Sequence, residues 1–287
     1  METRFWKLAR RELAIGERTL VMGVLNVTPD SFSDGGRFFD AEVAVRHAER
    51  MIEEGADIID MGGESTRPGG APVGVEEESG RVLRVVEAVA RVSPVPVSID
   101  TTKAAVARRA LDAGAEVVND ISGLRFDPAL ADEVARTRAG LVLMHSRGEQ
   151  QTLHALEPVA DIWREVFDTL RAGVGEAARR GVARAAIAVD PGIGFGKSQE
   201  QNVELVARLG RFAHEFEGHT VLVGTSRKSF IGRITGEARA DARLHGTMAT
   251  VTAAILQGAH VIRVHDVRAA VEAARVADAL KAASLKS

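Results

Sequence analysis

Eight short apolar runs recur along the chain of 287 residues, and each run ends abruptly in polar or glycine-rich sequence. The runs are rich in β-branched residues and lack the alternation of a half-exposed strand, which is typical of strands covered on both faces. We therefore expect eight buried strands. Their positions in the sequence are 20–25, 57–61, 95–99, 116–118, 140–144, 186–189, 220–223 and 260–264.

Apolar residues at helical spacing occupy the segments between the runs. After the last run, for example, they are Val267, Val271, Val276 and Leu280. Strands that alternate with helices form a parallel sheet, because right-handed crossovers place each helix on a face of the sheet. The residues that we expect to cap helices are Asp40, Thr101 and Asp266.

A closed barrel accounts best for this order of elements. Eight strand–helix units in a chain of 287 residues predict an α/β fold, the (β/α)8 TIM barrel. Residues 1–18 precede the first strand, and we expect this short N-terminal extension to cover the bottom of the barrel. No linker, low-complexity tract or charge block divides the chain, so we expect a single domain over residues 1–287.

Composition excludes several kinds of chemistry. The chain has no cysteine and no tyrosine, which excludes disulfides, thiol nucleophiles and thiolate metal sites. Its net charge of -3 gives no general basic field for nucleic acid or anionic membranes. The first thirty residues carry charges throughout and contain no apolar stretch typical of a secretion signal. We expect a cytoplasmic protein with no nucleic-acid or membrane partner, in which any bound anion is held locally.

Polar residues follow the apolar runs at the points where the strands are expected to end. In a (β/α)8 barrel the reacting groups lie at these carboxyl ends. A helix cap or a loop hydrogen bond explains any one of these residues equally well, but so many on one rim predict an active site. They are Asn26, Glu64, Thr66, Arg67, Asp100, Asn119, Asp120, His145, Asp190, Ser226, Arg227, Lys228, Arg263 and His265.

Two long loops follow the first two runs. Residues 26–36 read NVTPDSFSDGG and residues 62–70 read GGESTRPGG, so both are rich in glycine, proline or serine and carry isolated charges. Such loops are suited to closing over a substrate. Ordinary surface connections are the alternative, although the first loop is longer than most connections between a strand and a helix.

A glycine-rich segment, DPGIGFGKS, follows the sixth run at residues 190–198. It is not a phosphate loop, because Pro191 stands where the first glycine is needed, and Lys197 stands at the third glycine of the dinucleotide fingerprint. The glycines instead allow the backbone to approach a flat ligand, which Asp190 would hold and Phe195 would flank.

An anion pocket is expected at the last run. Arg263 and His265 are two residues apart, so their side chains point to the same side of a strand. With Asn26 and Lys228 they would hold a phosphate group, although a salt bridge at the rim is an alternative for Arg263. The histidines form no zinc-binding pair, so the metal that the sequence allows is Mg²⁺ held mainly by substrate phosphates and one side-chain oxygen.

Seven segments together resemble one enzyme family. In chain order they are NVTPDSFSDGG from Asn26, GGESTRPG from Gly62, SIDT from Ser98, VNDI from Val118, DPGIGFGK from Asp190, SRKS from Ser226 and RVHD from Arg263. Each segment is modest alone, but their joint order from the first strand to the last is highly specific. The sequence therefore resembles the dihydropteroate synthases of folate biosynthesis over nearly the whole chain.

The resemblance implies a pterin-binding barrel over residues 1–287 and a transferase that joins p-aminobenzoate to 6-hydroxymethyl-7,8-dihydropterin diphosphate, releasing pyrophosphate. It assigns the pterin to Asp100, Asn119, Met144, Asp190, Phe195, Lys228 and Arg263. It assigns the diphosphate to Asn26, Arg263 and His265, with Mg²⁺ on Asn26. It assigns p-aminobenzoate to Phe32, Thr66, Arg67 and Ser229, and catalysis to Asp100, Lys228, Asp34 and Arg67. The family is a target of sulfonamides, and the resemblance also implies a homodimer.

The rim offers cations for a leaving diphosphate but no credible nucleophile for a covalent intermediate. We therefore expect the carbon–oxygen bond to break first, giving a carbocation that the pterin stabilises. Ser146 and Arg147 depart from the Met-Gln expected in the family, which leaves the role of their loop open. The alternatives are a pterin-binding methyltransferase domain, which needs neither the loops nor the Lys228 segment, and a non-catalytic pterin-binding barrel.

Overall fold

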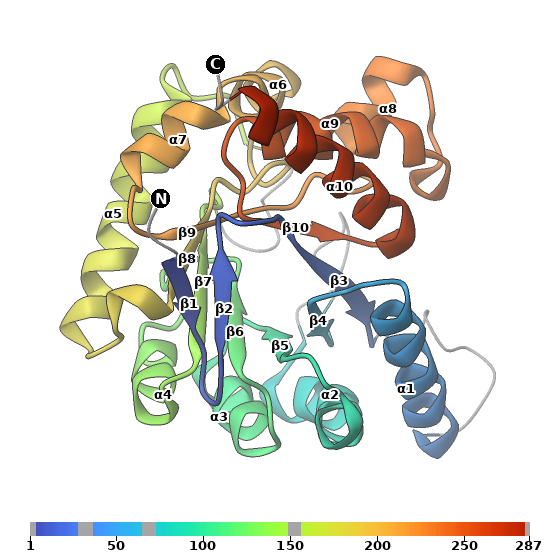
Figure 1. Ribbon diagram of the computed structural model, residues 1–287. Helices are drawn as coiled ribbons and strands as arrows, with labels where there is room; N and C mark the ends of the chain where they lie inside the picture. Colours follow the sequence, from blue (N-terminus) through green and yellow to red (C-terminus); the bar gives the residue numbers. More distant parts are fainter. Residues whose placement is uncertain (1–3, 28–36, 65–72, 149–155, 285–287) are drawn as a thin grey trace.

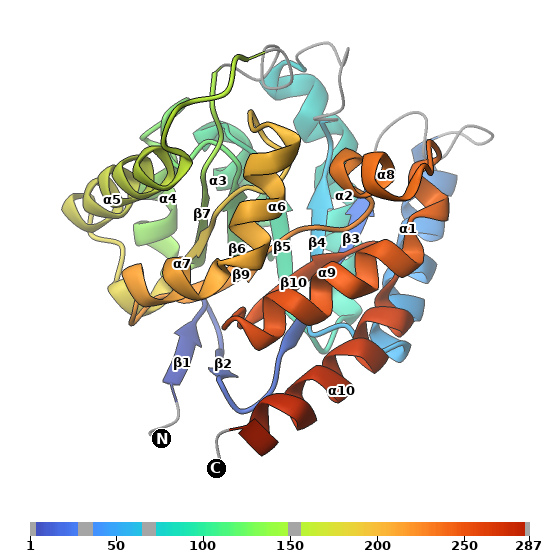
Figure 2. The ribbon, with the colours of Figure 1, turned by 90° about the horizontal axis from the view of Figure 1, so that it is seen from above.

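The computed structural model describes residues 4–27, 37–64, 73–148 and 156–284. Within these residues, eight parallel strands close into a barrel in the order β10-β3-β4-β5-β6-β7-β8-β9. Figure 1 shows helices on all sides of the ring, and Figure 2 shows the molecule turned by 90°. The predicted (β/α)8 barrel is confirmed. The strands are β3 Leu20–Asn26, β4 Ile58–Gly62, β5 Val97–Asp100, β6 Val117–Asp120, β7 Gly140–Met144, β8 Ile187–Asp190, β9 Thr220–Val223 and β10 Val261–Val264.

Every predicted strand is present, with its ends displaced by no more than two residues. Every residue of β6, β7 and β8 is buried. The barrel interior covers one face of these strands and the outer helices cover the other, which explains why their sequences are apolar without alternation.

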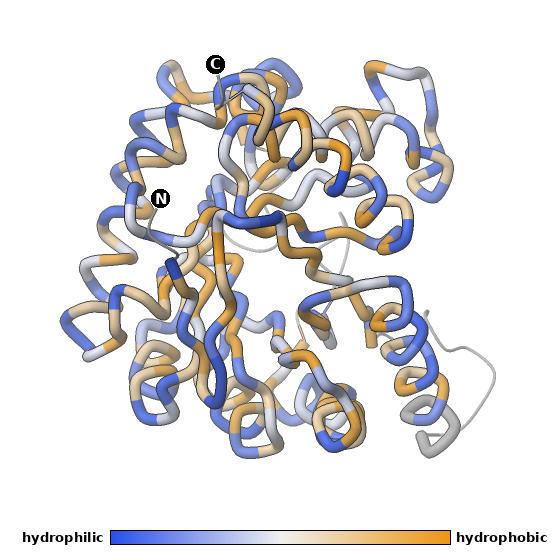
Figure 3. Tube along the Cα trace, viewed as in Figure 1, coloured by the Kyte–Doolittle hydropathy of each residue, from blue (hydrophilic) through white to orange (hydrophobic). Residues whose placement is uncertain are grey.

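The helices form the outer layer, and along them hydrophilic and hydrophobic residues alternate as expected for helices with one buried face (Figure 3). In α2, acidic residues occupy the first turn, where they complement the positive end of the helix. No helix in the described part of the chain is long and apolar enough to cross a membrane. The helices are α1 Arg37–Glu53, α2 Val75–Val92, α3 Ala104–Asp112, α4 Leu130–Thr137, α5 Ile162–Arg179, α6 Gln199–Ala207, α7 Leu209–Glu215, α8 Ser229–Thr235, α9 Leu244–Leu256 and α10 Val267–Ser284.

Two of the three predicted helix caps are wrong. Helix α1 begins at Arg37, so Asp40 lies inside its first turn. Helix α3 begins at Ala104, whose N–H is bound by Asp127 Oδ2 at 2.8 Å, so a residue distant in sequence takes the role expected of Thr101. Asp266 does stand directly before α10, but its carboxylate binds Arg227.

Helix α10 is present as predicted, but its buried face differs from the predicted apolar stripe. Val276 and Leu280 are 61% and 54% exposed. Most of the buried residues of the helix are small, and the helix packs against α9. Its buried residues are Val267, Ala270, Ala274 and Ala277.

The predicted N-terminal extension is an antiparallel hairpin of β1 Arg4–Lys7 and β2 Glu12–Ile15. In Figure 2 it lies at the opposite end of the barrel from α8. Trp6 is fully buried in a cluster with residues of the barrel strands, among them Leu20 and Ile58, and its Nε1 donates to the carbonyl oxygen of Ala186 at 2.8 Å. The hairpin thus covers the bottom of the barrel, as expected.

Candidate active site

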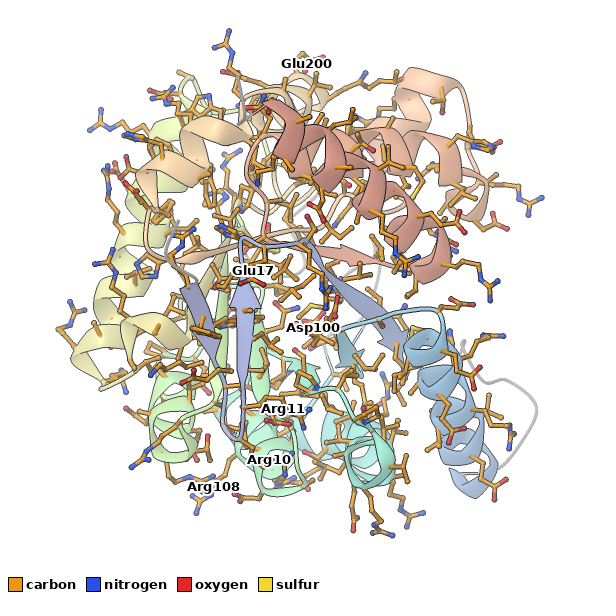
Figure 4. The ribbon with its side chains drawn as sticks, in the orientation of Figure 1. Arg10, Arg11, Glu17, Asp100, Arg108 and Glu200 are labelled. Atoms are coloured by element: carbon orange, nitrogen blue, oxygen red, sulfur yellow. The ribbon has the colours of Figure 1, made fainter. Side chains whose placement is uncertain are left out.

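The carboxyl ends of neighbouring strands place polar side chains side by side. Asp100 is the last residue of β5, and in the ladder it stands between Gly62 of β4 and Asn119 of β6. Gly62 lies directly beside the Asp100 side chain, since a Cβ atom at Gly62 would be in van der Waals contact with the Cβ of Asp100 at 3.4 Å. Figure 4 shows Asp100 within the ring of strands.

An arginine from β10 crosses this end of the barrel to two carboxylates. Arg263 Nε donates to Asp60 Oδ2 at 2.6 Å, and its Nη2 donates to Asp100 Oδ2 at 2.8 Å. Asn119 Nδ2 donates to the same Asp60 oxygen at 3.1 Å. The rim salt bridge considered for Arg263 is therefore present, and it joins residues that the sequence placed in one pocket.

Asp60 is the residue of this network that the sequence analysis missed. It lies inside β4 rather than after it, is fully buried, and its Oδ1 has no hydrogen-bond partner among the described residues. A lone carboxylate within a buried apolar strand is costly, and this was the signal that could have identified it. Asp60 aligns Arg263 and Asn119 from within the barrel.

Burial raises the pKa of two carboxylates in the site. The pKa of Asp100 rises to about 7, because burial and the neighbouring carboxylates outweigh the opposing charge of Arg263. The pKa of Asp190 rises to about 6 through burial, against the hydrogen bond from Gly192 N–H and the charge of Lys228. Hydrogen-bond donors on a ligand would stabilise the ionised form of both.

The glycine-rich segment after β8 folds tightly around Asp190. Its Oδ1 accepts from Gly192 N at 2.6 Å. Gly192 has a φ of +66°, and a Cβ atom there would lie 1.8 Å from the carbonyl oxygen of His145, so only glycine fits. Lys197 Nζ bonds to Gly192 O at 2.7 Å and to His145 Nδ1 at 2.8 Å. Lys197 thus links His145 to the turn at Gly192.

An aromatic ring and a lysine form one wall of the site. Phe195 clusters with Ile121 and Met144, and Lys228 Nζ lies 3.8 Å from the centroid of the Phe195 ring. Burial and the charge of Arg263 lower the pKa of Lys228 to about 8. The sequence placed Met144, Phe195 and Lys228 in one pocket, and the structure brings the three together.

The expected anion residues lie at or beyond the ends of β3, β9 and β10. Asn26 and His265 line one pocket of about 650 Å³ together with Arg227, Asp266 and residues of α1 and α10, whereas Arg263 and Lys228 are not among its lining residues. Burial and the charges of Arg263, Arg227 and Lys228 lower the pKa of His265 to about 3, so this imidazole is neutral in the ligand-free protein. It bonds through Nδ1 to Ser226 Oγ at 3.0 Å.

Other predicted rim residues have structural partners. Both carboxylate oxygens of Asp120 accept backbone N–H bonds within the next turn. Glu64 accepts from Val73 N at 2.9 Å and from Lys103 Nζ at 2.6 Å. The hydrogen bond from Val73 thus links Glu64, which precedes residues 65–72, to the residue that follows them.

The Ser146–Arg147 departure also has a structural role. Ser146 Oγ accepts from Arg125 Nη2 at 3.0 Å, and Arg147 Nη1 donates to the carbonyl oxygen of Gly196 at 2.9 Å. The two residues therefore tie the segment after β7 to the segments after β6 and β8.

Five predicted residues remain, and only Ser229 lies in the described part of the chain. It is the exposed first residue of α8, directly after Lys228. The described residues contain no group of three or more His, Cys, Asp or Glu side chains that could hold a metal ion. Four predicted residues lie outside the described part of the chain: Phe32, Asp34, Thr66 and Arg67.

Comparison with known proteins identifies the family of this chain. The family model of pterin-binding enzymes matches residues 22–265. A dihydropteroate synthase of Synechocystis sp. is 46% identical over 265 residues, which cover 92% of this chain and 91% of that protein. The chain belongs to the dihydropteroate synthase family. It therefore has dihydropteroate synthase activity, a transferase activity of folate biosynthesis.

Solved dihydropteroate synthases share the whole fold. The enzyme from Xanthomonas albilineans with 4-aminobenzoic acid has a TM-score of 0.89 and 43% identity, covering 97% of this chain and 99% of that chain. The enzyme from Burkholderia cenocepacia complexed with 7,8-dihydropteroate has a TM-score of 0.87 and 41% identity, covering 99% of each chain. The expected activity is confirmed, and the methyltransferase alternative is not supported.

Proposed function

We propose that this dihydropteroate synthase binds 6-hydroxymethyl-7,8-dihydropterin diphosphate in the barrel mouth and couples it to p-aminobenzoate. The observation that supports this most directly is the Arg263 network, which brings Asp100 and Asn119 together at the end of the barrel. The Burkholderia relative carries 7,8-dihydropteroate, the product of this reaction.

The pterin ring matches the polar groups of the site. Asp190 would accept hydrogen bonds from the amino group and a ring N–H, while Asn119 offers both a donor and an acceptor. Lys228 would donate to the ring carbonyl. Met144 and Phe195 would cover the flat faces of the ring, and the guanidinium of Arg263 is suited to stacking on it.

The diphosphate would lie at Asn26, Arg263 and His265. Because His265 is neutral without ligand, it would act first as a hydrogen-bond donor, and the arriving negative charge would raise its pKa. Asn26 would hold Mg²⁺ through its side-chain oxygen together with the bound diphosphate, since Mg²⁺ prefers oxygen ligands and is seldom enclosed by protein alone. When bound, it would neutralise negative charge on the leaving diphosphate.

For p-aminobenzoate we propose the residues that the family resemblance assigns, Phe32, Thr66, Arg67 and Ser229. Ser229 is placed at the first residue of α8, next to Lys228, where an exposed hydroxyl and backbone N–H groups suit a carboxylate. Asp34 would help to organise the closed loops.

We further propose that the carbon–oxygen bond breaks before the aniline attacks. The bonding electron pair leaves with the diphosphate, the methylene carbocation is delocalised into the pterin, and the amine nitrogen then bonds to that carbon and loses a proton. The carboxylate of Asp100 would stabilise the cation electrostatically. Positional exchange of oxygen in the diphosphate during turnover tests this order, and its absence under turnover conditions counts against it.

Ser226 and His265 form the one serine–histidine pair of the described rim, so a covalent route has to be considered. With its pKa lowered to about 3, His265 is a poor base for removing the serine proton near neutral pH. Ser226 also accepts from His265 N at 3.2 Å, which occupies its oxygen. A Ser226→Ala variant that retains turnover would support the dissociative route, and loss of turnover with intact substrate binding would support the covalent one.

The activity test mixes the purified protein with Mg²⁺, the dihydropterin diphosphate and labelled p-aminobenzoate, and measures labelled dihydropteroate. Formation of product supports the proposed reaction. Pterin binding without product would favour the non-catalytic alternative.

We also propose a homodimer that forms through α9 and α10. These helices pack on each other, and the sequence of α9 contains no Asp, Glu, Lys or Arg. Leu256, Val276 and Leu280 leave large apolar side chains exposed on them. Light scattering on the purified protein tests this assembly, and Val276→Lys should shift a dimer towards monomer, whereas an unchanged mass would contradict this interface.

A further inference from the structure

Strands β9 and β10 stop pairing before they reach the active site. The two strands pair only at Val261–Leu222 and Ile262–Val223. The cationic groups of the site lie beyond these pairs: Arg263 is within β10, and Lys228 stands directly before α8 in the segment that follows β9. Nothing in the ladder itself therefore sets the distance between these groups.

These groups repel one another. The charge of Arg263 lowers the pKa of Lys228, and the charges of Arg263 and Lys228 both contribute to the lowered pKa of His265. Burial strengthens this repulsion, because the effective dielectric constant is lower than in water. The carboxylates of Asp60 and Asp100 offset part of this repulsion at Arg263, and an attractive contact between the two segments would offset more of it.

Side chains supply that contact beyond the end of the ladder. Ser226 Oγ bonds to His265 Nδ1 and accepts from His265 N. One residue further on, Arg227 makes a two-pronged ion pair with Asp266, with Nη2 to Oδ1 at 2.6 Å and Nε to Oδ2 at 3.1 Å. Both side chains of this pair are less than one-third exposed, so the pair is better protected from solvent than most surface ion pairs.

The backbone of Arg227 is held in an uncommon conformation. Its φ is +60°, in the left-handed region, which is unfavourable for a residue other than glycine. The conformation is held by α9 and the residue before it: Arg227 N donates to Thr247 Oγ1 at 3.1 Å, and Arg243 Nη1 donates to Arg227 O at 2.9 Å. Such strain persists where the surroundings require a particular geometry.

We propose that Arg227 and Asp266 are positioning residues, whose ion pair holds the Lys228 segment against the Arg263–His265 segment. When the Lys228 segment is held against the Arg263–His265 segment, both can contact the same bound pterin diphosphate. The inference rests on the proposed function, because it assigns the pair to the diphosphate and pterin groups of the same site. Neither Arg227 nor Asp266 needs to touch substrate in this role.

The test uses two variants that change net charge in opposite directions. Arg227→Met removes a positive charge and Asp266→Asn removes a negative one. If the pair acted only through long-range charge, the first would weaken and the second would strengthen the binding of inorganic pyrophosphate with Mg²⁺. A positioning role predicts that Arg227→Met and Asp266→Asn each raise the Kd of pyrophosphate about tenfold. The double variant should bind pyrophosphate no more weakly than the worse single variant, because all three variants lose the same contact.

Arg227→Lys keeps the charge but loses the fork geometry, and a loss of about threefold is expected. It also provides the measurement if Arg227→Met fails to fold. Turnover should fall with each variant, since Lys228 is displaced along with the diphosphate site.

The matched control is the Arg18–Asp57 pair at the opposite end of the barrel, with bonds of 2.8 and 2.5 Å. Asp57→Asn should lower the melting temperature but leave the Kd of pyrophosphate unchanged. Opposite shifts for Arg227→Met and Asp266→Asn, unchanged affinity, or additive losses would overturn the inference. Failure of the unaltered protein to bind pyrophosphate or to form dihydropteroate would instead overturn the proposed function.

Discussion

Pterin binding should be linked to the ionisation of Asp190. In the ligand-free protein burial raises the pKa of this carboxyl to about 6. A ring that donates N–H bonds to both oxygens requires the carboxylate, so binding at lower pH must release a proton. Affinity therefore falls as the pH falls through this pKa.

The size of the effect follows from the ionised fraction. With a pKa of about 6, nearly all of Asp190 is ionised at pH 8, about half at pH 6 and about one-tenth at pH 5. The Kd for 6-hydroxymethylpterin should therefore rise about twofold from pH 8 to pH 6 and about tenfold from pH 8 to pH 5 through this residue alone. Asp100, with a pKa of about 7, adds a further loss that begins at higher pH.

Calorimetric titration measures both quantities. The Kd is determined from pH 8 to pH 5, and buffers of different ionisation enthalpy give the number of protons released, about one-half at pH 6 from Asp190. Asp190→Asn binds more weakly but should lack this share of the pH dependence, because an amide oxygen accepts without ionising. A wild-type Kd that stays constant from pH 8 to pH 5 would refute the reasoning.

Three further outcomes are expected. Arg263→Ala should weaken binding of the dihydropterin diphosphate about 10- to 100-fold and of the unphosphorylated pterin much less, as loss of a charged hydrogen bond implies; equal losses in calorimetry would contradict the anion pocket. Trp6→Ala should lower the free energy of unfolding by about 3–5 kcal/mol in urea titrations while kcat is retained, since this fully buried ring lies at the far end of the barrel; a shift below about 1 kcal/mol would contradict its packing role. His265 has a pKa of about 3 in the folded protein against about 6.5 when unfolded, so its contribution to stability is complete above pH 6.5 and is lost as the pH falls towards 3. His265→Gln should therefore lose less stability in acid than the unaltered protein. An unchanged dependence of the free energy of unfolding on pH would argue against this.

Local sequence patterns predicted the elements of the barrel. Each apolar run is a strand because only a residue set without alternation can be buried on both faces. Polar residues that end runs, such as Asp100 and Asp190, lie at the carboxyl ends of their strands as predicted, because the carboxyl ends of parallel strands lie at one edge. Asp100 and Asn119 stand side by side in the ladder through this rule.

Long-range contacts explain the misses. Thr101 is displaced as a cap by Asp127, a partner that no local pattern reveals. Val276 and Leu280 satisfy the helical period but are exposed, because alanines and Val267 form the buried face of α10. Asp60 was missed because its neighbours in sequence are apolar, whereas its partners Asn119 and Arg263 come from other strands.

The sequence by itself determined the number and order of the barrel strands, the rim on which chemistry occurs and the absence of thiol and phenol groups, since these follow from residue type and spacing. The tertiary structure alone decided the charge state and alignment of the site. Closure of the barrel brings Arg263 of the last strand to Asp60 and Asp100, raises the pKa of the carboxyls of Asp100 and Asp190, and leaves His265 neutral. These properties depend on burial and on charges from distant segments, which exist only once the ring has closed.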